Sequence, residues 1–367
     1  MNTLVPLELY SSVYFNILLL FVLILYSIVS KKQEQGNVEA NDLNVFGFVF
    51  FGFVFLYMAL RPISFVFADM GVYAKEFISL ANNENNYIGK DIGFDLLIRF
   101  CAKIMSVELF FVTCALLYIL PLYLASKKYF GKFWVYSFFM LVISMSFWAY
   151  GTNGIRNGLA TSFFIYALSR DKLWSKIGFM IIAVLFHKSL LLVAFAFIIT
   201  KYYTNTKAYL AVWFLTIPLS LALGSFWETF FFNLGLVEDD KLAGYLIDDA
   251  AVVDQLIELK VGFRWDFILY SATGVFAGWY FILKKKFDDS QYIQLYSMYL
   301  TVNAFWILVI RANYSNRFAY LSWFMLSIII IYPLLKQDFF ENQYKVLGKI
   351  IFLYYMFTYI INFVFAN

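Results

Sequence analysis

The sequence predicts an all-α polytopic membrane protein with about ten to twelve transmembrane or re-entrant helices. Of the 367 residues, 63% are hydrophobic and 14% are charged. A soluble domain is about 45–50% apolar and about 25% charged. With a mean hydropathy of +0.74, most of the chain must have the bilayer as its solvent. Backbone groups in lipid must be bonded within their own segment, so we expect helices rather than strands.

The stretches between charged residues define the candidate spans, because a crossing helix needs about 20 apolar residues. These uncharged runs are 9–30, 43–60, 109–126, 133–155, 208–227, 267–283, 290–310, 318–335 and 350–367. The shorter run 157–169 can cross with its flanks. The first run lacks a preceding basic residue and a small-residue cleavage site, so we expect a retained helix. We expect residues 1–367 to form a single transmembrane domain.

Residues 177–200 have two interpretations. His187 and Lys188 split this apolar run into halves that are each too short to cross alone. The segment is therefore either one span with a polar centre or a re-entrant helical hairpin. Only the hairpin places all lysine-rich loops on the cytoplasmic side, as the positive-inside rule requires. The hairpin also predicts that the N- and C-termini both lie outside.

Two stretches outside the spans are long enough to fold. Residues 61–106 form a predicted outer loop that ends in an amphipathic helix lying on the membrane, over 91–106. Residues 228–263 form a second predicted outer loop, which is acidic but apolar enough for one or two short helices.

His187 is the single histidine of the chain and lies between two apolar half-segments. An ionisable residue at membrane depth is by default a functional candidate. Histidine exchanges a proton near neutral pH, which suits it to general acid–base catalysis. The alternative is an inert interfacial histidine at a helix break.

Arginines are concentrated on the predicted outer side. Six of the seven lie there, namely Arg61, Arg99, Arg156, Arg264, Arg311 and Arg317. Guanidinium groups bind phosphate oxygens in a planar, bidentate way, which suits a lipid-linked pyrophosphate. The alternative for any one of them is an arginine that reaches out to lipid headgroups from a helix end. For Arg156 and Arg317, which lie on short turns, we favour the functional interpretation.

Neutral polar residues accompany these arginines. Asn153 and Asn157 flank Arg156 in a glycine-containing turn. Asp69 and Tyr73 are one helical turn apart in the first outer loop. They are suited to binding sugar hydroxyls, and Asp69 could instead cap a helix or act as a general base.

Several kinds of site are absent from the sequence. It has no glycine-rich phosphate loop, and we expect no metal, no cofactor and no nucleic-acid partner. The cytoplasmic loops are too short for a nucleotide-sugar-binding domain. A sugar donor would therefore have to arrive within the membrane as a lipid-linked species.

Three motifs in order along residues 50–335 resemble the EpsG/Wzy-type polysaccharide polymerases. They are Arg61…Asp69…Tyr73 with Gly93-Phe94, then Arg156-Asn157-Gly158-Leu159-Ala160 with Leu185-Phe186-His187-Lys188-Ser189, and Asn316-Arg317-Phe318-Ala319-Tyr320. Family members often have Gln where this chain has Asn157, and an aromatic residue where it has Lys188. The second difference could alter contacts with the acceptor.

The resemblance implies a GT-C-like glycosyltransferase of the bacterial inner membrane. Such an enzyme joins oligosaccharide repeat units carried on undecaprenyl pyrophosphate, on the outer side of the membrane. Arg156 and Arg317, helped by Arg61, Arg264 or Arg311, would then bind the donor pyrophosphate and stabilise it as it leaves. His187 or else Asp69 would take the proton of the acceptor hydroxyl. A chain-length regulator and a flippase are the partners that the family implies.

Three other functions are weighed against this one. An O-antigen-ligase-like enzyme would use similar arginine and histidine residues with a different acceptor. A flippase or transporter of lipid-linked sugars would be expected to show repeat symmetry and midplane charges, whereas these spans are nearly charge-free. A membrane acyltransferase would also use a single histidine but would have no role for the outer arginines.

Overall fold

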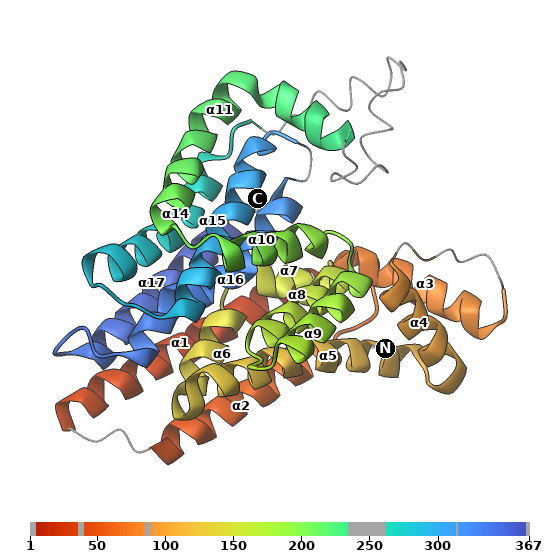
Figure 1. Ribbon diagram of the computed structural model, residues 1–367. Coiled ribbons are helices and arrows are strands. Elements are labelled where there is room, and N and C mark those ends of the chain that lie inside the picture. The colour runs from red at the N-terminus through yellow and green to blue at the C-terminus, as the bar shows by residue number, and fades with distance from the viewer. Residues whose placement is uncertain are drawn as a thin grey trace. The chain divides into compact units, whose positions relative to one another are not determined.

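The computed structural model describes residues 5–35, 40–84, 89, 91–233, 262–312 and 315–364. All regular secondary structure in these ranges is helical (Figure 1), which confirms the all-α prediction. Of the predicted outer segment 228–263, residues 234–261 lie outside the described ranges. The α-helices are α1 (Tyr10–Gln35), α2 (Ala40–Ala59), α3 (Asp69–Ala81), α4 (Ile92–Ile104), α5 (Val107–Phe130), α6 (Trp134–Val142), α7 (Met145–Thr152), α8 (Ile155–Leu168), α9 (Leu173–Phe186), α10 (Leu190–Tyr202), α11 (Thr206–Asn233), α14 (Trp265–Trp279), α15 (Ser290–Leu308), α16 (Asn316–Lys336) and α17 (Gln343–Val364).

The described residues contain six helical stretches that are long and apolar enough to cross a bilayer. They are Leu7–Ser30, Val107–Val142, Thr206–Trp227, Trp265–Lys284, Asn316–Lys336 and Gln343–Asn362. Three apolar helical stretches are shorter, namely Leu43–Ala59, Leu173–Phe186 and Leu190–Tyr202. The prediction of a polytopic membrane protein is confirmed by this set.

The helices form two compact units, which are described separately. The first unit comprises Met1–Leu190 and Ile331–Asn367, and the second comprises Leu191–Ile330. The chain passes between them at the start of α10 and again within α16.

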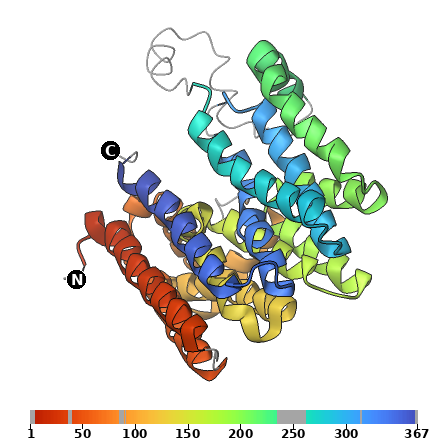
Figure 2. The same ribbon diagram turned by 90° about the vertical axis from the view of Figure 1, so that its left-hand side faces the viewer.

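In the first unit, α1 lies along α17, and the two run side by side in Figure 2. The Tyr355 hydroxyl on α17 donates a hydrogen bond to the Phe15 carbonyl of α1. Tyr10 and Tyr57 each donate their hydroxyl to the other's backbone carbonyl at 2.9 Å, which ties α1 to α2. Helix α5 packs against α2, α6 and α8, and α8 packs against α9.

The uncharged run 133–155 is not one continuous helix. It is divided into α6 and α7 by Ile143 and Ser144, where Ser144 has an extended backbone and its hydroxyl donates to the Leu141 carbonyl at 2.7 Å. Every residue of α6 is buried, so the interior of the protein accommodates this short helix. A run without charged residues can therefore be a helix buried inside the protein as well as a helix that crosses the membrane.

The segment 177–200 is also divided, at the place where its charges predict a break. Helix α9 ends at Phe186, residues 187–189 are non-helical, and α10 begins at Leu190. Helix α9 belongs to the first unit and nearly all of α10 to the second. The return of the chain that a re-entrant hairpin requires stays a prediction.

Helix α4 occupies the segment for which an amphipathic helix was expected. Its buried side consists of Phe94, Ile98 and Cys101, while Leu97 is half-buried. A second apolar row recurs every fourth residue and is exposed, consisting of Ile92, Leu96, Phe100 and Ile104. One side of α4 thus packs on the protein and another is apolar and uncovered by the described chain. Its position on a membrane surface stays a prediction.

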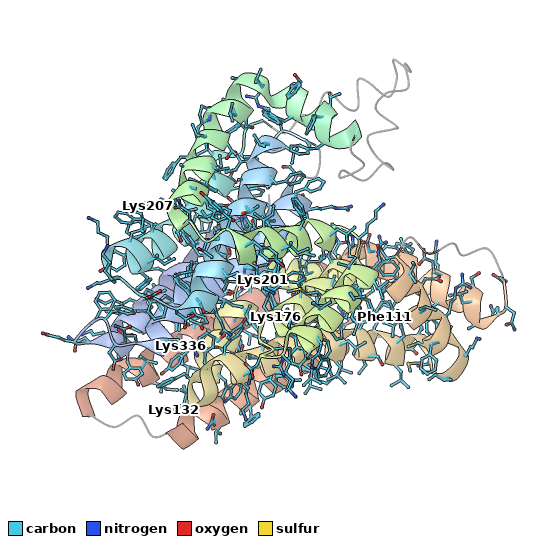
Figure 3. All side chains as sticks on the ribbon, viewed as in Figure 1. Phe111, Lys132, Lys176, Lys201, Lys207 and Lys336 are labelled. Carbon is cyan, nitrogen blue, oxygen red and sulfur yellow. The ribbon has the colours of Figure 1, made fainter. Side chains whose placement is uncertain are left out.

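Basic residues gather at one end of the first unit. Lys128, at the end of α5, forms an ion pair with Asp171 in the loop after α8. The Lys336 ammonium lies 5.7 Å from the ring centroid of Phe130, the last residue of α5. Figure 3 labels three lysines of this part of the chain, Lys132, Lys176 and Lys336. Helix α8 rises about 21 Å from Ile155 to Leu168, so its first turn lies well away from these loops.

In the second unit a buried polar network holds the helices together. The Asn303 amide on α15 donates to the hydroxyls of Ser271 at 3.0 Å and Ser322 at 2.9 Å. Its carbonyl oxygen accepts the Trp213 indole N–H at 2.7 Å. Because these polar groups are paired with one another, the network stabilises the packing of α11, α14, α15 and α16.

Candidate functional site

The candidate site is built around the turn between α7 and α8. Helix α7 ends at Thr152, and the N–H groups of Asn153 and Gly154 both donate to the Ala149 carbonyl. Helix α8 then passes close to α7, because a Cβ on Gly158 would lie 2.7 Å from the Tyr150 carbonyl oxygen. Glycine at this position permits the close approach of α8 to α7.

Arg156 lies in that first turn and is held by two side chains from elsewhere in the chain. Its Nη1 lies 2.6 Å from Oδ2 of Asp91, and its Nε donates to the Tyr73 hydroxyl at 2.9 Å. The Arg156 side chain is 19% exposed and that of Asp91 is 2% exposed. The guanidinium is therefore oriented before any ligand binds.

Tyr73 projects from α3 into the interior of the first unit. Its ring centroid lies 4.8 Å from that of Phe94 on α4. Burial raises the pKa of the Tyr73 hydroxyl well above its ordinary value, with Arg156 opposing that shift. The hydroxyl thus stays protonated and accepts the Arg156 N–H as a neutral group.

Asp91 connects Arg156 to the break between α9 and α10. Its Oδ1 accepts the backbone N–H of Lys188 at 3.1 Å, while its Oδ2 contacts Arg156. This reach depends on Gly93, where a Cβ would lie 2.8 Å from the Leu185 backbone carbon. Helices α4 and α9 therefore touch through their backbones beside Asp91.

His187 follows the last residue of α9 and is buried. Its backbone is extended, with φ −158° and ψ 118°. The ring Nδ1 lies 3.2 Å from the backbone N of Ser189 and 2.7 Å from its Oγ. Both backbone polar groups of His187 are bonded as well, the N–H to Ala183 and the carbonyl to Leu190. The ring is thus held by its own turn.

Asp69 and Asn153 also contact each other in this region. The backbone N–H of Asp69, the first residue of α3, donates to Oδ1 of Asn153 at 3.3 Å. Asp69 is one helical turn before Tyr73, so both side chains lie on the same face of α3. Asn157 is half-buried one residue after Arg156, and its carbonyl accepts the Thr161 hydroxyl.

Arg61 is a buried cation just beyond the end of α2. It is 4% exposed, its Nη1 donates to the Met58 carbonyl at 2.5 Å, and its Nε is buried without a hydrogen-bond partner. The rings of Phe67 and Phe111 lie 5.9 and 5.8 Å from its guanidinium carbon. Among the described residues no carboxylate neutralises it. Burial lowers the pKa of Arg61 to about 10, so the group stays charged at neutral pH.

The remaining candidate arginines belong to the second unit. Arg264 forms a two-bond ion pair with Asp266, at 2.9 and 2.6 Å, and its guanidinium carbon lies 3.6 Å from the ring centroid of Phe267. Arg311 is exposed and lies 5.9 Å from the ring centroid of the neighbouring Phe263. Arg317 is exposed in the first turn of α16.

The structure therefore brings Asp69, Tyr73, Asn153, Arg156 and His187 into one set of contacts in the first unit. The sequence reasoning missed Asp91 and Ser189, which complete that set. Asp91 was assigned only to the start of an amphipathic helix, because its role depends on the contact between α4 and α9, which the local sequence does not show.

A model of the EpsG family matches residues 44–367, which include every candidate site residue. The chain belongs to the EpsG family. The resemblance found in the sequence motifs is thereby confirmed. Membership of the EpsG family implies a polysaccharide-polymerase type of function and a glycosyltransferase-like polymerase activity. No curated protein and no solved structure matches the chain.

Proposed function

We propose that this EpsG-family protein joins oligosaccharide repeat units carried on undecaprenyl pyrophosphate, at the outer face of the bacterial inner membrane. The observation that carries the proposal is the contact of Arg156 with Asp91 and Tyr73, beside the helix break at His187. A pre-oriented guanidinium next to a buried histidine suits the transfer of a sugar from a pyrophosphate leaving group.

The charge of the first unit supports an anionic donor. Asp91 partly neutralises Arg156, so the pair alone would attract a pyrophosphate weakly. Arg61 adds a positive charge that no described carboxylate balances. Arg317, Arg264 and Arg311 belong to the second unit and are proposed to bind phosphate oxygens, because guanidinium groups do so in a bidentate way.

The reaction needs one bond made and one broken. The acceptor hydroxyl oxygen attacks C1 of the donor sugar, and the C1–O bond to the pyrophosphate breaks with its electron pair moving to the pyrophosphate oxygen. The proton of the acceptor hydroxyl passes to a base, for which His187 and Asp69 are the candidates. Arg156 stabilises the negative charge that develops on the leaving group.

The positions of charges along α8 support an outer location. Arg156 lies in the first turn of this helix, and the basic loop with Arg170 and Asp171 follows its last turn. Lysine-rich loops favour the cytoplasmic side. The opposite end of α8, with the candidate site, would then face outward, where flipped units arrive and a chain-length regulator can act.

A deletion strain complemented with plasmid variants tests this function. We expect deletion to leave single repeat units on the lipid carrier and wild type to restore long polymer on a gel. Arg156→Lys keeps the charge but loses the planar fork, so it should restore little polymer despite normal insertion. Arg170→Lys, at the other end of the same helix, is the matched control and should restore full length.

Two outcomes would overturn the proposal. Long polymer in the deletion strain would show that another protein polymerises the units. Lipid-linked units trapped on the cytoplasmic side would instead indicate a transporter. Full polymer length with Arg156→Lys would remove the pyrophosphate role of Arg156.

A further inference from the structure

The contact between His187 and Ser189 determines which ring nitrogen carries the proton. The backbone N of Ser189 lies 3.2 Å from Nδ1 of His187. A backbone N–H can donate but cannot accept a hydrogen bond, so Nδ1 must be the acceptor and must lack a hydrogen. In the neutral ring the single hydrogen then lies on Nε2.

The same contact opposes the charged form of the ring. An imidazolium carries hydrogens on both nitrogens. A hydrogen on Nδ1 would face the Ser189 N–H and would break the bond between the two groups. The Ser189 hydroxyl, whose Oγ lies 2.7 Å from Nδ1, can donate to the unprotonated nitrogen as well. Two groups of one residue thus favour the neutral ring with its proton on Nε2.

A base accepts a proton at an unprotonated atom. In His187 that atom is Nδ1, which already accepts the Ser189 N–H of its own turn. Asp69 presents the opposite situation. It is half-exposed, and its carboxylate makes no hydrogen bond or ion pair with any other described residue. By contrast, both carboxylate oxygens of Asp91 are engaged, so Asp91 is unsuited to taking a proton.

We propose that His187 serves the transfer as a neutral hydrogen-bond donor through Nε2–H, and that Asp69 takes the proton of the acceptor hydroxyl. The proposal rests on the proposed function and assigns the two roles that it leaves open. In this proposal the Nε2–H donates to an oxygen of the leaving pyrophosphate. The reason is that Asp91 bonds both the Lys188 N–H in the His187 turn and the cationic Arg156. No proton leaves His187 in this scheme. The C1–O electron pair moves to the pyrophosphate, and the hydroxyl proton moves to the Asp69 carboxylate.

The tautomer can be measured directly, because the chain has one histidine. Wild-type protein labelled with ¹⁵N-histidine gives one pair of ring nitrogen signals in an NMR spectrum. At neutral pH we expect a directly bonded hydrogen on Nε2 and none on Nδ1. A ring protonated on Nδ1, or on both nitrogens, would overturn the proposal without any activity assay.

Substitutions separate a donor from a base and from a turn-forming residue. Gln places an amide N–H near the position of Nε2, whereas Asn places a carbonyl oxygen near Nδ1 and keeps the turn with Ser189. We expect His187→Gln to retain polymerisation within about tenfold of wild type, and His187→Asn and His187→Ala to lose about a hundredfold or more. Asp69→Asn, which cannot take a proton, should be as inactive as His187→Ala.

Each result decides between the roles, provided that variants are compared per amount of inserted, folded protein. If His187→Gln is as inactive as His187→Ala while Asp69→Asn is active, His187 is the base and the proposal is wrong. If His187→Asn is fully active, His187 only shapes the turn. These failures leave the polymerase function intact, which fails separately if the deletion strain still makes polymer.

Discussion

Arg156 and Asp91 form a short ion pair, with 2.6 Å between the guanidinium Nη1 and the carboxylate Oδ2. The two residues are 65 positions apart in the chain. Asp91 is almost fully buried and also accepts the Lys188 N–H, so one carboxylate positions the arginine and the turn that contains His187. The arrangement of this site therefore depends on Asp91 more than on any residue that a motif identified.

Asp91→Asn should reduce polymer formation. The amide offers an N–H where the carboxylate accepted the Arg156 guanidinium, so the arginine would move away from its present position. A displacement of about 1 Å can cost about a hundredfold in rate. Polymer yield per folded protein checks the loss. Asp95→Asn, which removes the partner of Arg99 on the same helix, is the control and should stay near wild type. Full polymer with Asp91→Asn would show that the ion pair is dispensable.

Tyr73→Phe should weaken the site without disturbing the ring packing. It removes the hydroxyl that accepts the Arg156 Nε–H but leaves the ring against Phe94. A hydrogen bond to a charged group contributes about 1.5–3 kcal/mol, so we expect a roughly tenfold or greater loss of activity. Tyr359→Phe, which loses an exposed bond to Asn16, is a suitable control. Equal polymer length in both variants would argue against a role for the Tyr73 hydroxyl.

Gly93→Ala should separate α4 from α9. A Cβ there would meet the Leu185 backbone carbon at 2.8 Å and its oxygen at 2.9 Å, and backbone cannot move aside as a side chain can. Overpacking of this kind costs about 1–3 kcal/mol. We expect a lower melting temperature together with lost polymerisation, since Asp91 would be drawn away from Lys188. Gly178→Ala, with no atom within 4 Å of the added Cβ, should be tolerated. If both variants were as stable and as active as wild type, the close approach of α4 to α9 would be contradicted.

Arg61→Met should raise stability and lower activity. A buried charge without a carboxylate is costly to keep, and an apolar side chain of similar length removes that cost. If the charge serves an anionic substrate, the variant should melt at a higher temperature and make less polymer. Arg170→Met is the control for loss of a positive charge elsewhere in the first unit. Unchanged polymer with Arg61→Met would exclude a functional role for this charge.

The same variant has a defined pH dependence. Burial lowers the pKa of Arg61 in the folded protein from its higher ordinary value to about 10. A base with a lower folded pKa destabilises the fold while it is charged, and this destabilisation is relieved as the pH rises between the two values. The difference in melting temperature between Arg61→Met and wild type should therefore be full below pH 10 and smaller above it.

Much of the fold follows from the sequence, because charge and length determine where helices can cross a bilayer. The uncharged runs 109–126 and 318–335 lie within single helices, and all of the run 9–30 except Leu9 lies within α1. The run 133–155 shows the limit of that reasoning. Its interruption at Ser144 involves no charge, only a serine hydroxyl that bonds a nearby carbonyl inside the protein.

The motifs predicted much of the candidate site but not Asp91. Arg156 stands out as an arginine on a short turn and His187 as the single histidine of the chain. Tyr73 stands out as part of the first motif, with Arg61 and Asp69. Asp91 contributes through a contact between distant helices, which no local pattern encodes. The role of His187 likewise depends on the orientation of its ring toward Ser189, which spacing alone could not supply.

Purified protein in liposomes offers the most direct test of the central claim. The liposomes would be supplied with repeat units linked to undecaprenyl pyrophosphate, and products would be resolved by the number of repeats. We expect a ladder of longer lipid-linked chains with wild type and single units with Arg156→Lys. Single units alone from folded wild-type protein, or units moved across the bilayer without being joined, would contradict the assignment as a polymerase.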